Sequence, residues 1–172
     1  MARLTTLSRR AKEKEDRKER ILAAAREVFF ETGIRPATVD AIAARAAVAK
    51  GTVYLYFETK ETILAHLLLE GLDALNNYLM LAFDEAHPCP AETRLRRLAG
   101  AYYDFYLAEP DYFRLMMAFD RGQFRESVSP ELYERILLRS LRGLRWVVNA
   151  TQQGMDEAAF DRELAQQRFD LR

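Results

Sequence analysis

Residues 38–57 of this chain read TVDAIAARAAVAKGTVYLYF, and this stretch predicts two short helices joined by a tight turn. Thr38 is a good N-cap for the first helix, and the apolar residues that follow it recur at helical spacing. The small residues at 46–49 leave room for a turn, and residues 50–57 form the second helix. Two short helices joined by a turn of about three or four residues are typical of a helix-turn-helix, whose second helix enters the major groove of DNA.

A longer helix precedes this pair. One face of it carries the apolar residues Ile21, Leu22, Ala25, Val28 and Phe29. Gly33 can adopt the left-handed conformation that ends a helix, and Pro36 prevents the helix from resuming. Residues 1–16 are rich in Lys and Arg and are interpreted as a basic arm that need not be ordered. Residues 1–60 are therefore expected to form a three-helix DNA-binding head with a helix-turn-helix.

The rest of the chain, residues 61–172, is also expected to be helical, because strand signals are almost absent. A long helix opens at Thr59 and runs to about Phe83, before the His-Pro-Cys-Pro segment at 87–90 breaks it. Further helices are predicted over 91–108, over 111–120 after Pro110, and from Pro130 to about 153, with Gly154 as a stop. A last amphipathic segment follows from about residue 157. The fold class is thus all-α, with the head joined by a long helix to a helical body for effector binding and dimerisation.

Charge divides the chain in the same way. Residues 1–60 carry 13 Lys and Arg against 8 Asp and Glu, whereas residues 61–172 carry 13 against 18. The net charge is therefore +5 in the first part and −5 in the second, although the whole chain is neutral. A basic head on an acidic body is expected if only the head meets a polyanion such as DNA.

The sequence gives little support for catalysis or metal binding. Cys89 is the only cysteine, and the two histidines, His66 and His87, lie far apart, so neither a zinc-ligand cluster nor a His-assisted nucleophile is expected. No cofactor is expected either. The N-terminus lacks the features of a signal peptide, and no apolar run approaches the roughly 20 residues of a membrane span. These observations predict a cytoplasmic protein that is not an enzyme and has no membrane partner.

Residues 20–64 resemble the TetR family of bacterial transcriptional regulators. The resemblance rests on ordered residues across the whole head, namely 20–25 (RILAAA), Phe29, Gly33, Thr38-Val39, Ile42-Ala43, Ala46, Val48 and 50–61 (KGTVYLYFETKE). The length of this pattern makes it specific.

In that family the third helix reads the operator, which implies roles for individual residues here. The resemblance assigns Lys50, Gly51, Thr52, Tyr54 and Tyr56 to the DNA face and leaves Val53 and Phe57 buried. Hydroxyl groups and a lysine can bond to phosphates or base edges, and a glycine lets the backbone approach the duplex. Thr38 and Lys60 are expected to hold phosphates at helix N-termini. For Thr38 this is compatible with capping, because the hydroxyl can serve its own helix and a phosphate with different atoms.

The body matches the family only in its helical pattern. Aromatic and Met side chains concentrate in two helices around Pro110, and a candidate effector pocket is formed by Tyr102, Tyr103, Phe105, Tyr106, Phe113, Met116 and Met117. The alternative interpretation, favoured for any single residue, is core packing. Family members normally close their dimer with two C-terminal helices in a four-helix bundle, and this chain stops soon after the first of them would begin. Two explanations stay open, namely a truncated chain and dimerisation through a reduced surface. Candidate dimer contacts are Leu141, Leu144, Val148, Phe160, Leu164 and Phe169.

The function implied by the resemblance is that of a homodimeric repressor which a small apolar or amphipathic effector releases from a palindromic DNA operator. Activation by the same parts, with the opposite sign of coupling, stays open. Two other functional classes are alternatives. One is an enzyme or carrier whose head is a relic, and the head argues against it. The other is a heterodimerising interaction protein, which an uncovered apolar face at the short C-terminus would favour.

Overall fold

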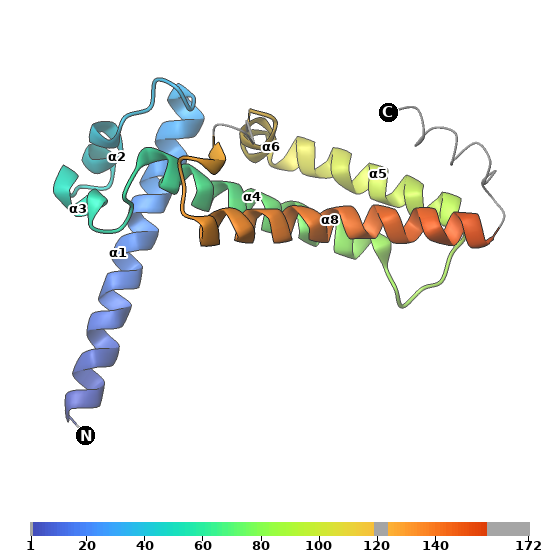
Figure 1. The fold of residues 1–172 in the computed structure, drawn as a ribbon, viewed down its shortest axis with the longest axis horizontal. Helices are drawn as coiled ribbons and strands as arrows, with labels where there is room; N and C mark the ends of the chain where they lie inside the picture. The colour runs from blue at the N-terminus through green and yellow to red at the C-terminus, as the bar shows by residue number, and fades with distance from the viewer. Residues whose placement is uncertain (1, 119–123, 158–172) are drawn as a thin grey trace. The chain divides into compact units, whose positions relative to one another are not determined.

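The computed structural model describes residues 2–118 and 124–157, and all regular structure in those ranges is helical (Figure 1). This confirms the all-α fold class. The helices are α1 (Ala2–Thr32), α2 (Val39–Arg45), α3 (Lys50–Tyr54), α4 (Lys60–Phe83), α5 (Ala91–Ala108), α6 (Pro110–Met117) and α8 (Pro130–Asp156). None of the helices in these ranges is both long and apolar enough to cross a membrane.

The contacts within the chain define two compact units. The first comprises Met1–Leu68 and Ala118–Leu132, and the second comprises Leu69–Met117 and Tyr133–Arg172. Helix α4 begins in the first unit and ends in the second. It is therefore the continuous element that links the helix-turn-helix to the helical body.

In the first unit, α2 packs beside the C-terminal half of α1, and α3 packs against α2 (Figure 1). The predicted apolar face of α1 is buried, and its Ile21 and Ala25 are fully inaccessible. Helix α1 ends as predicted, because Gly33 adopts the left-handed conformation, with φ of 86°, and its amide donates to the Phe29 carbonyl. Thr38 caps α2, since its hydroxyl oxygen accepts a hydrogen bond from the Ala41 amide at 3.2 Å.

Helix α1 differs from the prediction at its other end. It begins at Ala2, so residues 2–16 are part of a single 31-residue helix and do not form a separate arm. The mixed charges explain how this segment can be helical. Pairs such as Arg9–Glu13 and Glu15–Lys18 lie three or four residues apart, the spacing that brings opposite charges together on a helix surface.

The turn between α2 and α3 is built from small residues. Ala47 has a positive φ of 53°, a conformation that an alanine adopts at some cost, and the Val48 amide donates to the Ala43 carbonyl across the turn. Helix α3 is shorter than the predicted 50–57 and ends at Tyr54. The reason is local, because the Tyr56 amide bonds to the Val53 carbonyl, three residues back, which tightens the chain out of regular α-helix.

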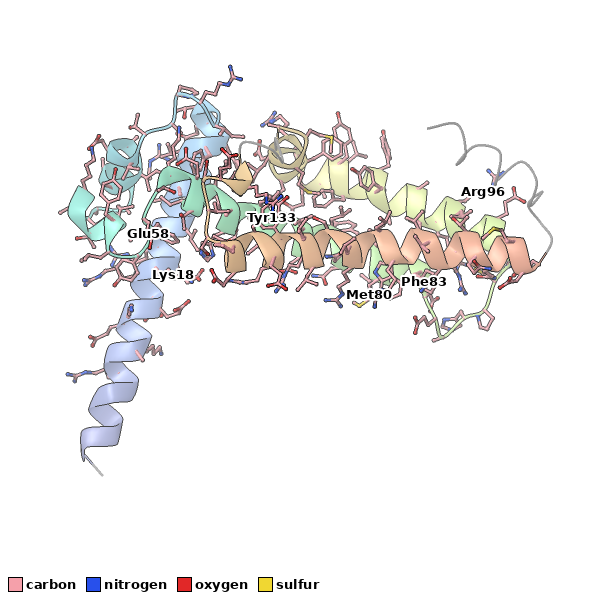
Figure 2. The ribbon with its side chains drawn as sticks, in the orientation of Figure 1. Lys18, Glu58, Met80, Phe83, Arg96 and Tyr133 are labelled. Atoms are coloured by element: carbon pink, nitrogen blue, oxygen red, sulfur yellow. The ribbon has the colours of Figure 1, made fainter. Side chains whose placement is uncertain are left out.

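In the second unit, α4, α5 and α8 run alongside one another (Figure 1). Their core consists of Leu75, Leu79, Phe83, Leu98, Ala101, Phe105 and Ala150. Two ring pairs show how the helices meet. The Phe105 ring of α5 is 5.9 Å from that of Tyr78 on α4, and the Phe83 ring, labelled in Figure 2, is 4.8 Å from that of Trp146 on α8.

Helix α8 runs through the glycine that was predicted to stop it. It continues to Asp156, and Gly154 is buried inside it. Tertiary hydrogen bonds hold this end in place. The Gln153 side-chain amide donates to the Cys89 carbonyl at 2.8 Å, and the Glu157 carboxylate accepts from the Ala91 amide at 2.9 Å. This second bond lowers the pKa of Glu157, as does the bond from Gln153.

Candidate nucleic-acid interface

Helix α3 has one exposed and one buried side. Lys50, Gly51 and Tyr54 are exposed and Thr52 is half-buried, whereas Val53 is completely buried. Tyr56, just after the helix, is also half-buried. The space around Gly51 is open, since a Cβ there would meet nothing within 4 Å. The predicted DNA face of this helix therefore consists of polar side chains and accessible backbone.

The buried side of α3 anchors this short helix to the rest of the first unit. The Phe57 side chain is 1% exposed, and its ring makes a T-shaped contact with the His66 ring on α4, with centroids 5.4 Å apart. Val53 and Phe57 are both buried, as the resemblance implied. A five-residue helix has little stability of its own, so these two side chains keep α3 in position.

Lys50 forms an ion pair with Asp40. Its Nζ lies 2.8 Å from Oδ2 of Asp40, which is in the first turn of α2. The hydrogen bond to this carboxylate raises the pKa of Lys50. Both side chains are at least half exposed, so the pair contributes little to stability and Lys50 stays accessible to an anionic partner.

Lys60 has partners that sequence reasoning did not foresee. Its Nζ donates to the carbonyl oxygens of Ile34, Arg35 and Ala37 at 3.1, 3.3 and 3.1 Å. These carbonyls belong to the loop between α1 and α2, and Lys60 is the first residue of α4. The resemblance implied a phosphate contact for Lys60, but in this structure all three ammonium protons have a carbonyl acceptor.

Two arginines of the head were also missed by sequence reasoning. The Arg20 guanidinium on α1 donates to the carbonyl of Ala46, the C-cap of α2, at 3.2 Å. Arg45 in the last turn of α2 bonds to Glu27 and to both carboxylate oxygens of Glu31 on α1. These bonds raise the pKa of Arg45, and the hydrogen bond from Arg45 lowers that of Glu31. No local signal could have found them, because the partners lie 14 to 26 residues apart in sequence.

The seven residues of the predicted effector pocket fall into different environments. Phe105 is fully buried in the core, and Phe113 and Met116 pack against that core. Tyr103 and Met117 are 59% and 60% exposed. The remaining two, Tyr102 and Tyr106, surround Phe113 with edge-to-face ring contacts, at centroid distances of 5.9 and 5.0 Å.

Helix α8 also carries exposed apolar side chains. They are Leu137, Leu138, Leu141, Leu144, Val147 and Val148, which we call the α8 stripe. Spacings of three and four residues place them together on the helix, while Ile136, Gly143 and Ala150 are buried. Three of the predicted dimer contacts, Leu141, Leu144 and Val148, belong to the stripe. The other three, Phe160, Leu164 and Phe169, lie outside the described residues.

Comparisons with known proteins agree with this helix-turn-helix. The family described as bacterial regulatory proteins, tetR family, matches residues 21–67. A fatty acid metabolism regulator protein of Bacillus subtilis is 46% identical over 61 residues, which cover 36% of this chain and 31% of that protein. The HTH-type transcriptional activator FasR of Mycolicibacterium smegmatis is 30% identical over 107 residues, which cover 62% of this chain and 48% of that protein. The chain thus spans less than half the length of these two relatives.

A solved structure extends the similarity beyond the head. The fatty acid degradation regulator FadR from Bacillus halodurans is 27% identical, with a TM-score of 0.60, and the match covers 87% of this chain and 79% of that one. The similar proteins are named as regulators and not as enzymes. From the matched head, the shared helical architecture and these relatives, we conclude that this chain belongs to the TetR family of bacterial regulatory proteins.

Proposed function

We propose that this protein is a DNA-binding transcriptional regulator that acts as a homodimer and reads a palindromic operator with α3. The observation that carries the proposal is the two-sided character of α3. Val53 and Phe57 fix the helix from within, while Lys50, Gly51, Thr52 and Tyr54 form a polar outer side. A helix that is anchored on one side and polar on the other suits insertion into the major groove.

The contacts of the head divide into two kinds. The hydroxyls of Thr52 and Tyr54 are proposed to reach base edges, where hydrogen bonds carry sequence information. Lys50 and Tyr56 are proposed to supply charge and a hydroxyl close to the DNA backbone. The Thr38 hydroxyl uses an oxygen lone pair to cap α2, so its proton is available for a phosphate oxygen.

The aromatic residues of α5 and α6 are proposed to contact the effector. Tyr102 and Tyr106 expose more than a third of their surface beside Phe113, so a ligand can meet three rings and two phenolic hydroxyls. This combination suits a small apolar or amphipathic molecule. Two of the similar proteins are named as fatty acid regulators, which agrees with an effector that carries a hydrocarbon chain.

The α8 stripe is proposed as the surface that joins the two protomers. Its six apolar side chains are between 38% and 58% exposed, and such a contiguous apolar surface is commonly covered by a partner. In a two-fold dimer the stripe of one protomer would pack on the stripe of the other. The two heads would then bind half-sites about one DNA turn apart, roughly 34–36 Å.

Regulation is proposed to follow from a shift between two conformations. The effector favours the one in which α4 holds the heads away from the operator spacing, so the affinity for DNA falls. This describes a repressor. An activator would use the same parts with the opposite sign of coupling, and FasR of Mycolicibacterium smegmatis carries that name.

The DNA-reading role is tested with matched substitutions and an operator recovered by selection from random DNA. Thr52→Val and Tyr54→Phe each remove one hydroxyl from α3. The controls remove the same group elsewhere, with Thr32→Val on α1, whose hydroxyl bonds to the Val28 carbonyl, and Tyr133→Phe on α8 (Figure 2). Operator affinity is measured by fluorescence anisotropy, with random DNA as the reference.

Each α3 variant is expected to lose about 1–3 kcal/mol of operator binding while its affinity for random DNA stays unchanged, because base contacts are specific to sequence. The two controls should bind the operator like the wild type. If both α3 variants bind the operator as tightly as their controls, α3 does not read the bases and the proposal is wrong.

A further inference from the structure

The Lys60 side chain uses all of its hydrogen-bonding capacity within the first unit. Its ammonium donates to three carbonyl oxygens, those of Ile34, Arg35 and Ala37, within 3.3 Å. An ammonium has three protons, so its hydrogen-bonding capacity is used up. The residue is only half-exposed, and the bonds join two segments that lie 23 to 26 residues apart.

The loop that Lys60 contacts connects α1 to α2. It lies just beyond the C-terminal end of α1, where the helix dipole places partial negative charge, so a cation is favourable there. Pro36 lies within the loop and prevents helical continuation, and the carbonyls on both sides of it point to one ammonium. The next residue after Ala37 is Thr38, the N-cap of α2.

We propose that Lys60 is a positioning residue that fixes the start of α2 on the start of α4, and that it does not act as a phosphate contact. Helix α2 is then held at both ends. Lys60 secures the loop before it, while Arg20 and Arg45 bind its C-terminal end to α1. Because Lys60 is the first residue of α4, a displacement of that first turn would move the loop and Thr38 with it. This inference rests on the proposed function, since it describes how the DNA-reading head is kept in register.

The two roles for Lys60 predict different dependence on salt. A lysine that contacts a phosphate displaces a counterion, so its loss lowers the slope of log affinity against log salt by about 0.9 and weakens specific and non-specific binding alike. A positioning lysine leaves the slope unchanged, and its loss weakens the operator complex far more than the complex with random DNA.

The variant is Lys60→Met, which keeps most of the side-chain volume but removes the charge and the donors. The control is Arg96→Met on α5 (Figure 2), which removes one exposed positive charge outside the first unit. Binding to operator and to random DNA is measured over a range of salt concentrations, at a temperature where circular dichroism shows each protein to be folded.

For Lys60→Met we expect the operator affinity to fall about tenfold, which is the loss expected when one good base contact is no longer aligned. The slope of log affinity against log salt should stay unchanged. Affinity for random DNA should fall by less than about threefold, and Arg96→Met should match the wild type. A fall in slope of about one, with equal losses on both DNAs, would overturn the proposal, as would unchanged operator affinity.

Amide hydrogen exchange tests the same role without DNA. In Lys60→Met the Ala41 amide, which bonds to Thr38, should exchange at least about tenfold faster, while amides in α8 keep their rates. Unchanged exchange at Ala41 would contradict the proposal. If the wild type binds no DNA, the proposed function fails, and exchange still decides whether Lys60 holds the loop.

If Lys60→Met does not fold, the wild-type protein labelled with ¹⁵N-lysine decides the question. The chain has only five lysines, all within residues 12–60, so few ammonium signals need assignment. The Lys60 signal should keep its position when operator DNA is added, because its carbonyl partners stay in place. A shift of that signal, together with slower proton exchange of the ammonium, would show a phosphate contact and overturn the proposal.

Discussion

Gly143 lies in the middle of α8, where that helix comes very close to α4. A Cβ added to Gly143 would lie 2.8 Å from Oδ1 of Asn76 and 3.4 Å from Cδ1 of Leu79. Asn76 is the buried polar residue of this contact, 4% exposed, and its side-chain amide donates to the Arg139 carbonyl at 3.0 Å. Gly143→Ala therefore pushes a methyl group into an oxygen that has little room to move.

The expected change in the free energy of unfolding combines two opposite effects. Alanine is the better helix former by about 1 kcal/mol, which favours the variant. Against this, overpacking costs about 1–3 kcal/mol, and displacing Asn76 strains or breaks a buried hydrogen bond, which costs about 1–3 kcal/mol more. We therefore expect Gly143→Ala to be destabilising by about 1–5 kcal/mol overall.

Two further variants make this test specific to the contact. Gly100→Ala in α5 is the control, because a Cβ there meets nothing within 4 Å, and we expect it to stabilise the protein by up to about 1 kcal/mol. In an Asn76→Ala background the oxygen is gone, so Gly143→Ala should change sign and become neutral or stabilising. Unfolding in urea, followed by circular dichroism, gives all the values. A stabilising Gly143→Ala in the wild-type background would refute the reasoning.

Three other predictions concern single interactions. Phe57→Ala should lower the free energy of unfolding by about 3–5 kcal/mol, because it empties a fully buried site beneath α3, and a loss below about 1 kcal/mol in urea unfolding would contradict that role. The hydrogen bond from Arg45 lowers the pKa of Glu31 in the folded protein. The pair therefore contributes fully to the free energy of unfolding at pH values above the pKa that Glu31 has in the unfolded chain, and this contribution is lost as the pH falls through the lower folded-state pKa of Glu31. The stability difference between the wild type and Glu31→Gln should accordingly shrink on acidification, and a difference that stays constant with pH would argue against it. Tyr112→Phe removes the hydroxyl that donates to Glu70 at 2.6 Å and should cost about 0.5–1.5 kcal/mol in urea unfolding, whereas an unchanged midpoint would show that the bond adds nothing.

The features that could be predicted from the sequence are those with a local signal. Gly33 ends α1, Thr38 caps α2, and Pro110 is the first residue of α6, each as its residue type and position indicated. The burial of Val53 and Phe57 followed from the family resemblance. Such features depend on residues within a few positions of one another, which is the range over which sequence patterns are informative.

The features that could not be predicted depend on distant partners. Gly154 looked like a helix stop, but bonds from the end of α8 to Cys89 and Ala91, more than 60 residues away, hold the helix past it. The three carbonyls around Lys60 likewise come from a loop about 25 residues earlier. Neither set of contacts leaves a pattern in the sequence near the residue concerned.

The aromatic residues of α5 are an intermediate case. Phe105 was grouped with the candidate pocket, yet it is fully buried in the core. A signal was present, because Leu98, Ala101 and Phe105 are spaced three and four residues apart and so share one face of the helix. The dense run of aromatic residues obscured that period, since Tyr102, Tyr103 and Tyr106 are equally bulky but lie on the exposed side.

The most direct test of the central claim is a selection of bound sequences from a random DNA library, using the purified protein at physiological salt. The account predicts enrichment of a palindromic motif whose half-sites are centred about one helical turn apart. It also predicts that Tyr54→Phe, which alters α3 alone, weakens or changes the bases selected. A folded wild-type protein that enriches no sequence would contradict the claim that α3 reads an operator.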